Sequence, residues 1–129
     1  MATPPGAFPT LQTITAASES GNRDYDNGQP VRSPKGALYS MQVMPSTATN
    51  PGFGVKPAQA QTPAEYNRVG REYLSALHGH YGGDLVKMWA AYNAGPGTVD
   101  KLVATYGRGW WHHLPTETLN YVNKNLGNM

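Results

Sequence analysis

The sequence contains no cysteine, which excludes disulfide bonds, thiolate nucleophiles and cysteine-ligated metals. It also contains few charged residues, 14% of the chain, and these are scattered singly to give a net charge of only +2. Recognition of nucleic acid needs clustered lysine and arginine, so we expect no nucleic-acid partner. A mild positive balance is compatible with an anionic polymer as substrate but does not identify one.

A long apolar run is missing as well. No stretch approaches the roughly 18 apolar residues that cross a membrane, so we expect no membrane span. The first nine residues, Met-Ala-Thr-Pro-Pro-Gly-Ala-Phe-Pro, lack the basic start and apolar run of a secretory signal. If the substrate lies outside the cytoplasm, we therefore expect delivery by a phage particle or a holin-type release, or a leader that has been removed.

Glycine and proline, by contrast, are plentiful. The chain of 129 residues contains 15 glycines and 11 prolines, which divide it into short elements. Its length suits one domain around a single core. We predict one all-α domain over residues 1–129, made of short helices and loops, with a minimal β-hairpin as the only sheet structure, in the loop 20–36.

Capping residues and helical periodicity place the helices. The first should open at Pro9, end before Gly21 and carry Glu19 in its last turn. Thr62 begins a capping box in which Glu65 should reach back to the helix start. Further helices are expected from Pro45, after Asp84, after the turn at 95–97 and from about Thr116, the last burying Leu119, Val122 and Leu126.

Glu19 is the first candidate for chemistry. The negative end of a helix dipole disfavours a carboxylate, so the pKa of Glu19 should be raised. A carboxyl group that stays protonated near neutral pH can act as a general acid. Asp24 and Asp26 are candidates for a second carboxylate, although Asp-Tyr-Asp-Asn-Gly is also ordinary turn sequence. The alternative for Glu19 is a solvated glutamate at a helix end.

Four short motifs follow Glu19 in a fixed order. They are Ser-Pro-Lys-Gly-Ala at 33–37, Met-Gln-Val-Met-Pro-Ser-Thr-Ala at 41–48, Ala-Tyr-Asn-Ala-Gly-Pro-Gly at 91–97 and Glu-Thr-Leu-Asn-Tyr-Val at 117–122. With Glu-Ser-Gly-Asn at 19–22, they resemble the lytic transglycosylases of the soluble-transglycosylase (SLT) type. These enzymes belong to the lysozyme superfamily and cut the glycan strands of bacterial peptidoglycan. The resemblance covers residues 10–126.

The resemblance implies a lysozyme-like fold and a lyase reaction on peptidoglycan glycan strands. The β-1,4 bond between N-acetylmuramic acid and N-acetylglucosamine would be cleaved without water, with Glu19 as acid and then as base. The acetamido group of muramic acid would stabilise the cationic centre, and its 6-hydroxyl would close a 1,6-anhydro ring. No cofactor is implied.

The same resemblance gives roles around the substrate to Ser33, Gln42, Met44, Tyr92, Asn93, Glu117 and Tyr121. The hydroxyl of Ser33 and the carboxamides of Gln42 and Asn93 suit sugar hydroxyl and N-acetyl groups. Met44 would give the groove an apolar floor. The hydroxyl of Tyr121 would lie beside the catalytic glutamate, with Glu117 supporting the structure nearby.

Several of these motif residues have an equally ordinary explanation. Tyr92 suits binding or packing, and Met41 suits core packing at least as well as a place in the groove. Glu117 could simply stabilise the first turn of its helix. Trp110 and Trp111 fit sugar stacking or closure of the core equally.

The histidines do not indicate a metal site. His78-Gly-His80 and His112-His113 lack the His-Glu-x-x-His arrangement of zinc peptidases, and adjacent histidines seldom share one site. We therefore expect no metal.

The chain also departs from the family. Tyr39-Ser40 stands where the family usually has Gly-Leu, and a tyrosine there could narrow a sugar subsite or add a stacking platform. Only 18 residues precede Glu19, where the family commonly has an additional helix. This suggests a trimmed member of the family, or a domain of a larger phage or cell-wall-remodelling protein that acts in the periplasm or at the cell wall.

Two other functions fit parts of the sequence. A lysozyme-type hydrolase would cleave the same bond with Asp24 or Asp26 activating water, and an inverting pair should stand roughly 6.5 to 9.5 Å apart. A non-catalytic module that binds peptidoglycan would keep the groove but would have no need of Glu19.

Overall fold

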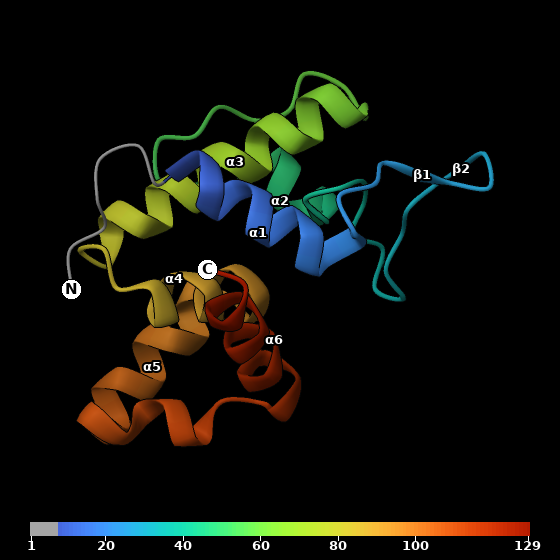
Figure 1. The fold of residues 1–129 in the computed structure, drawn as a ribbon. Helices are drawn as coiled ribbons and strands as arrows, with labels where there is room; N and C mark the ends of the chain where they lie inside the picture. The colour runs from blue at the N-terminus through green and yellow to red at the C-terminus, as the bar shows by residue number, and fades with distance from the viewer. Residues whose placement is uncertain (1–7) are drawn as a thin grey trace. The chain divides into compact units, whose positions relative to one another are not determined.

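The computed structural model describes residues 8–129, and helices make up most of this part of the chain (Figure 1). The elements are α1 (Phe8–Ser20), β1 (Tyr25–Asp26), β2 (Gln29–Pro30), α2 (Pro45–Thr49), α3 (Pro63–His80), α4 (Leu85–Ala94), α5 (Pro96–Tyr106), the 3-10 helix η1 (Gly107–His113) and α6 (Thr116–Gly127). The predicted all-α class is confirmed, and the small hairpin lies inside the expected loop 20–36. No helix among these residues is long and apolar enough to cross a membrane. The expectation about a secretory signal falls largely on residues 1–7, which lie outside the described part.

The chain divides into two compact units, and the boundary falls between Ala76 and Leu77 inside α3. The first unit holds α1, the hairpin, α2 and most of α3. The second unit holds the last turn of α3 and the elements from α4 to α6, where α4 packs against α5 and α6, and α5 packs against η1. A single domain over residues 1–129 stays a prediction.

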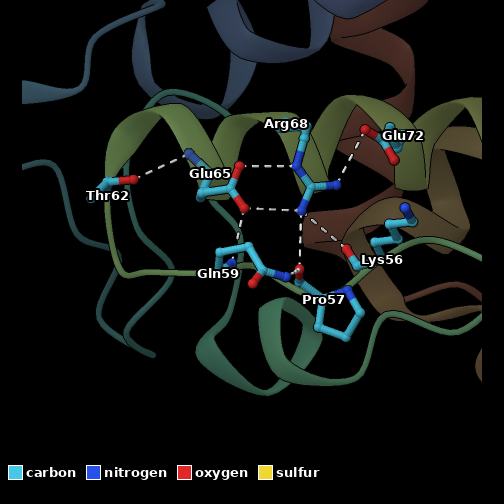
Figure 2. A network of polar contacts seen from close by, with 7 residues as sticks. All are labelled: Lys56, Pro57, Gln59, Thr62, Glu65, Arg68 and Glu72. Carbon is cyan, nitrogen blue, oxygen red and sulfur yellow. Dashed lines mark hydrogen bonds and ion pairs between the residues drawn. The ribbon is translucent and has the colours of Figure 1, made fainter.

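The predicted starts of α3 and α4 are confirmed by their caps. The Oδ1 atom of Asp84 accepts a hydrogen bond from the Lys87 N–H at 3.0 Å, and the Oγ1 atom of Thr62 accepts from the Glu65 N–H at 3.2 Å. The prediction that the Glu65 side chain reaches back to the start of α3 is wrong. Glu65 instead accepts from the Gln59 N–H at 2.9 Å, so its carboxylate holds the preceding loop to α3 (Figure 2).

The buried stripe of α6 differs from the prediction. Thr118, Val122 and Asn125 are buried, whereas Leu126 is 38% exposed. These positions still follow helical spacing, but the stripe is centred about one residue earlier than expected. This face of α6 packs against α4, and the Thr118 hydroxyl on it donates to Asn93 Oδ1 at 2.8 Å, so the buried face includes Thr118 rather than Leu126.

The segment between α5 and α6 forms η1, which the sequence did not indicate. Gly107, with φ of +60°, ends α5, and the chain continues directly into the 3-10 helix. Its two tryptophans separate: Trp110 is buried, and Trp111 is 41% exposed and stacks on His112 at 3.7 Å. Trp110 therefore packs in the core, and only Trp111 presents a ring to the surface.

Candidate functional site

Glu19 lies in the last turn of α1, where the sequence placed it, and its side chain is partly buried. The helix ends because the next two residues adopt positive φ, +68° at Gly21 and +61° at Asn22. Their N–H groups donate to the carbonyls of Ala17 and Ala16 at 2.9 and 3.0 Å. The backbone of Glu19 is thus held at the end of a helix whose last carbonyls are negatively polarised.

The neighbour of Glu19 fastens this helix end to a loop. Ser20 is buried, and its hydroxyl donates to the Ser40 carbonyl at 2.8 Å and accepts from the Arg23 N–H at 3.1 Å. The end of α1 and Ser40 are therefore held together across 20 residues of sequence. A shift of the end of α1 would therefore also move Ser40.

Ser40 belongs to a tight turn, residues 39–42, that we call the 39–42 loop. Leu38 and Val43 flank it and exchange both backbone hydrogen bonds, at 3.0 and 3.1 Å. Between them Tyr39 and Gln42 take φ values of +65° and +50°. Residues other than glycine rarely adopt this region, so surrounding contacts must hold the loop in place.

Asp24 and Asn67 supply those contacts. Asp24 Oδ1 accepts from the Ser40 N–H at 3.0 Å and from Asn67 Nδ2 at 2.7 Å. Asn67 Oδ1 accepts from the buried Met41 N–H at 3.1 Å. No motif in the sequence pointed to Asn67. Its position three residues before Gly70 and seven before Leu74, on the buried face of α3, is the signal that could have identified it.

Gln42 uses its amide nitrogen inside the protein. Nε2 donates to the carbonyl of Tyr39 at 2.8 Å and to that of Val31 at 3.2 Å. Among residues 8–129, no hydrogen bond reaches its Oε1 atom, which is therefore the part of Gln42 that could accept from a ligand. The carboxamide has a fixed orientation because both of its N–H groups are engaged.

Ser33 and Met44 belong to the same unit. In the sequence, Ser33 precedes the 39–42 loop and Met44 follows it. Ser33 forms a turn in which its hydroxyl oxygen accepts from the Ala37 N–H at 3.0 Å, so its proton is the group a ligand could accept. Met44 is partly buried at the start of α2, whereas Met41 is only 2% exposed. Core packing is the correct interpretation of Met41.

Tyr39 is buried and offers no sugar-stacking surface. Its ring contacts Tyr66 and Tyr25 edge to face, at centroid distances of 5.7 and 6.1 Å, and its hydroxyl donates to the Gln61 carbonyl at 3.1 Å. Burial, with the nearby Tyr25, raises the pKa of this phenol. The exposed ring of the group is Tyr25, which is 53% exposed on the hairpin.

The second unit brings together the remaining predicted residues, on α4 and α6. Asn93 is exposed and its Oδ1 accepts from Thr118, so Nδ2 is the group it can offer to a ligand. Tyr92 and Tyr121 are partly buried. Glu117 is exposed in the first turn of α6, where the helix dipole favours a carboxylate. Within the described residues, no group of three or more histidine or acidic side chains is arranged to hold a metal ion.

A helical fold that ends its first helix at a glutamate and joins two later helices through Ala-Tyr-Asn-Ala-Gly-Pro-Gly defines a lysozyme-like domain. The family model of the transglycosylase SLT domain matches residues 9–109, and the chain belongs to this family.

Curated relatives and solved structures agree with this assignment. The chain is 40% identical over 76 residues to the soluble lytic murein transglycosylase of Escherichia coli K12, and 39% identical over 75 residues to that of Salmonella typhimurium. Each match covers 54% of this chain and 12% of the relative.

Two solved lytic transglycosylases have the same fold. An inactive mutant of lytic transglycosylase Slt from Pseudomonas aeruginosa superposes with a TM-score of 0.73 at 32% identity. The 70 kDa soluble lytic transglycosylase from Escherichia coli gives the same TM-score at 28% identity. Each covers 92% of this chain, which spans only 20% of the solved protein.

Proposed function

We propose that this protein cleaves the β-1,4 bond between N-acetylmuramic acid and N-acetylglucosamine in peptidoglycan, without water, and leaves 1,6-anhydromuramic acid ends. Glu19 is the catalytic residue, and no cofactor takes part. The reaction takes place at the cell wall or in the periplasm, where the substrate lies. The observation that carries the proposal is the position of Glu19, partly buried in the last turn of α1 and fastened through Ser20 to the 39–42 loop.

The chemistry needs one carboxyl group in two protonation states. Glu19 first gives its proton to the bridging oxygen, and the bond from that oxygen to the muramic acid C1 breaks. The acetamido carbonyl of the muramic acid stabilises the cationic C1. The Glu19 carboxylate then takes the proton of the 6-hydroxyl, whose oxygen bonds to C1, so the residue ends protonated and no water is consumed.

The relatives support a mechanism with one glutamate. The Pseudomonas aeruginosa structure is described as an inactive mutant, and the change replaces a glutamate by glutamine. The substitution removes a proton donor while keeping nearly the same shape. Glu19→Gln is the corresponding experiment here.

The two aspartates that a hydrolase would require have other partners. Asp24 holds the 39–42 loop through Ser40 and Asn67, so its orientation is set by the protein rather than by a water molecule. Asp26 lies on the exposed hairpin strand β1, with Oδ1 at 3.5 Å from Arg23 Nη1. These contacts favour the single-glutamate reaction over water activation.

The substrate-binding roles belong to the same proposal. The Ser33 hydroxyl and Asn93 Nδ2 would donate to sugar and N-acetyl oxygens, and Gln42 Oε1 would accept. Met44 would provide apolar contact. The side chains of Tyr92, Glu117 and Tyr121 would complete the contacts to the glycan.

Mass spectrometry of fragments released from purified peptidoglycan tests the reaction. Wild type should release products one water lighter than reducing muropeptides, and Glu19→Gln should release none. Glu72→Gln, the same substitution at an exposed position on α3, is the control and should behave as wild type. Reducing products would establish a hydrolase instead, and a wild type that binds peptidoglycan without releasing products would establish a binding module.

A further inference from the structure

The backbone of Tyr39 takes part in all the hydrogen bonds that fix the Gln42 side chain. Gln42 Nε2 donates to the carbonyls of Tyr39 and Val31, at 2.8 and 3.2 Å. The Tyr39 N–H donates in turn to that same Val31 carbonyl at 2.9 Å. The three residues therefore form a closed ring of hydrogen bonds, in which Tyr39 supplies one acceptor directly and holds the other.

This ring of hydrogen bonds depends on the backbone conformation of Tyr39. The φ and ψ angles of a residue set the direction of its N–H relative to its carbonyl, and Tyr39 has a φ of +65°. A residue with a Cβ atom is strained at this φ, whereas glycine adopts it readily. Since a tyrosine occupies the position, other contacts must hold it in this conformation.

The side chain of Tyr39 makes those contacts. Its ring is only 4% exposed and packs edge to face on Tyr66, which belongs to α3. Its hydroxyl donates to the Gln61 carbonyl, 22 residues further along the chain. Ring and hydroxyl thus attach the 39–42 loop to two segments that are distant in the sequence.

The segment that accepts this hydroxyl is itself held to α3. The Arg68 guanidinium donates to two carbonyls of the preceding loop, at 3.2 and 3.0 Å, and Glu65 accepts from the Gln59 N–H at 2.9 Å (Figure 2). The Gln61 carbonyl follows two residues after Gln59. Tyr39 is therefore anchored to a fixed point rather than to a free loop.

We propose that Tyr39 is a positioning residue for the substrate, because its buried side chain keeps the 39–42 loop in the conformation that fixes Gln42. The inference rests on the proposed function, since it takes Gln42 as a residue that binds the glycan. With both Nε2 protons engaged inside the protein, Gln42 meets the substrate through Oε1, as an acceptor. It therefore selects a group that donates, such as a sugar hydroxyl or the N–H of an N-acetyl group.

Tyr39→Ala and Tyr39→Gly separate the backbone conformation from the ring. Both changes remove the ring and the hydroxyl, but only glycine keeps the positive φ without strain. For soluble glycan fragments, Tyr39→Ala should raise KM about fivefold with little change in kcat, while Tyr39→Gly should stay within about twofold of wild type. Packing alone would predict that glycine is at least as harmful as alanine. Circular dichroism sets the assay temperature at one where every variant is folded.

Two further variants test whether the effect passes through Gln42. In Gln42→Ala, adding Tyr39→Ala should leave KM unchanged, because the carboxamide that Tyr39 positions is gone. Tyr73→Ala is the packing control, since the Tyr73 ring contacts Phe53 edge to face at 6.0 Å within the same unit. Its loss should lower stability without raising KM. Equal rises in KM for Tyr39→Ala and Tyr39→Gly, or a Tyr39→Ala effect that persists in Gln42→Ala, would overturn the assignment.

NMR relaxation of the Gln42 side-chain amide gives a readout that needs no enzymatic activity. Nε2 should be rigid in wild type and in Tyr39→Gly, and mobile in Tyr39→Ala. A carboxamide that stayed equally rigid in Tyr39→Ala would refute the positioning role. A wild type that cleaves no glycan would instead refute the proposed function, and the relaxation data would still decide whether Tyr39 fixes Gln42.

Discussion

Asn67 and Asp24 are joined by a 2.7 Å hydrogen bond from Asn67 Nδ2 to Asp24 Oδ1, and each side chain also holds one N–H of the 39–42 loop. Asn67 comes from α3 and Asp24 from the loop after α1. The pair therefore fixes the segment that Ser20, the neighbour of Glu19, contacts. The pair therefore helps to position the end of α1, which carries the proposed catalytic residue, and takes no part in the proposed chemistry.

Removing the Asn67 side chain should lower the stability of the protein. Asn67→Ala removes the acceptor of the buried Met41 N–H and one of the two hydrogen bonds that Asp24 Oδ1 accepts, and we expect a loss of about 2 to 4 kcal/mol in unfolding free energy. Urea denaturation measures this loss. Asn123→Ala, at an exposed position on α6, is the control and should change stability by less than about 0.5 kcal/mol.

A double-mutant cycle shows whether the two residues act as a unit. Asp24→Ala combined with Asn67→Ala should cost clearly less than the sum of the single changes, because the shared hydrogen bond is lost only once. Strictly additive losses would show that the contact contributes nothing of its own.

Tyr39 is a second position where strain and packing oppose each other. Tyr39→Gly should relieve about 1 kcal/mol of strain at its positive φ but lose the buried ring, which is typically worth about 3 to 5 kcal/mol. We expect a net loss of about 2 to 4 kcal/mol in thermal or urea unfolding. Tyr39→Phe keeps the ring and loses only the hydrogen bond to Gln61, about 1 kcal/mol. A Tyr39→Gly protein as stable as wild type would show that the ring contacts contribute little.

Local signals in the sequence predicted the helix boundaries well. Asp84 and Thr62 cap their helices as expected, and Glu19 ends α1 before Gly21, because each depends on a few neighbouring residues. The family motifs located the candidate residues for the same reason. They are short strings that resemble those of a known family, and such a resemblance can be seen without the fold.

The contacts that hold those residues could not be predicted in the same way. The positive φ of Tyr39 depends on contacts with Gln61 and Tyr66, which lie far along the chain. No neighbouring residue in the sequence indicates this conformation. Thr118 is buried on the face of α6 that packs against α4, where its hydroxyl donates to Asn93. In both cases, the backbone conformation of Tyr39 and the burial of Thr118, the contacts come from residues that are distant in the sequence.

Glu65 should make stability depend on pH. The hydrogen bonds from Arg68 and from the Gln59 N–H lower its pKa below the ordinary value of 4.5 (Figure 2). The folded state therefore binds this proton more weakly than the unfolded chain. The stabilisation is present above the ordinary value and is lost as the pH falls through the lowered pKa of the folded state.

Unfolding free energies from about pH 7 to about pH 3 test the sign of this effect. Glu65→Gln should be less stable than wild type near neutral pH, and the difference should shrink as the medium becomes acidic. Arg68→Gln removes the same interaction from the other partner and should show the same trend. A difference that stayed constant over the range would mean that the network does not sense the Glu65 charge.

Thr118 should act on the substrate through Asn93. Its hydroxyl holds Asn93 Oδ1 at 2.8 Å, which directs Nδ2 away from α6. Thr118→Val keeps the shape but loses this hydrogen bond, so the carboxamide should turn freely and bind the N-acetyl group less well. Because Asn93 is proposed to bind the glycan and not to react with it, KM for soluble glycan fragments should rise about threefold to fivefold while kcat changes little.

Thr118→Ser restores the hydroxyl and should restore KM. Thr105→Val is the matched control, since the Thr105 hydroxyl donates only within its own helix, to the Lys101 carbonyl at 2.8 Å. In Asn93→Ala, the further change Thr118→Val should have no effect on KM, because the group it orients is gone. A fall in kcat at constant KM, or a KM effect of Thr118→Val that persists without the Asn93 side chain, would show that Thr118 does not act by orienting Asn93.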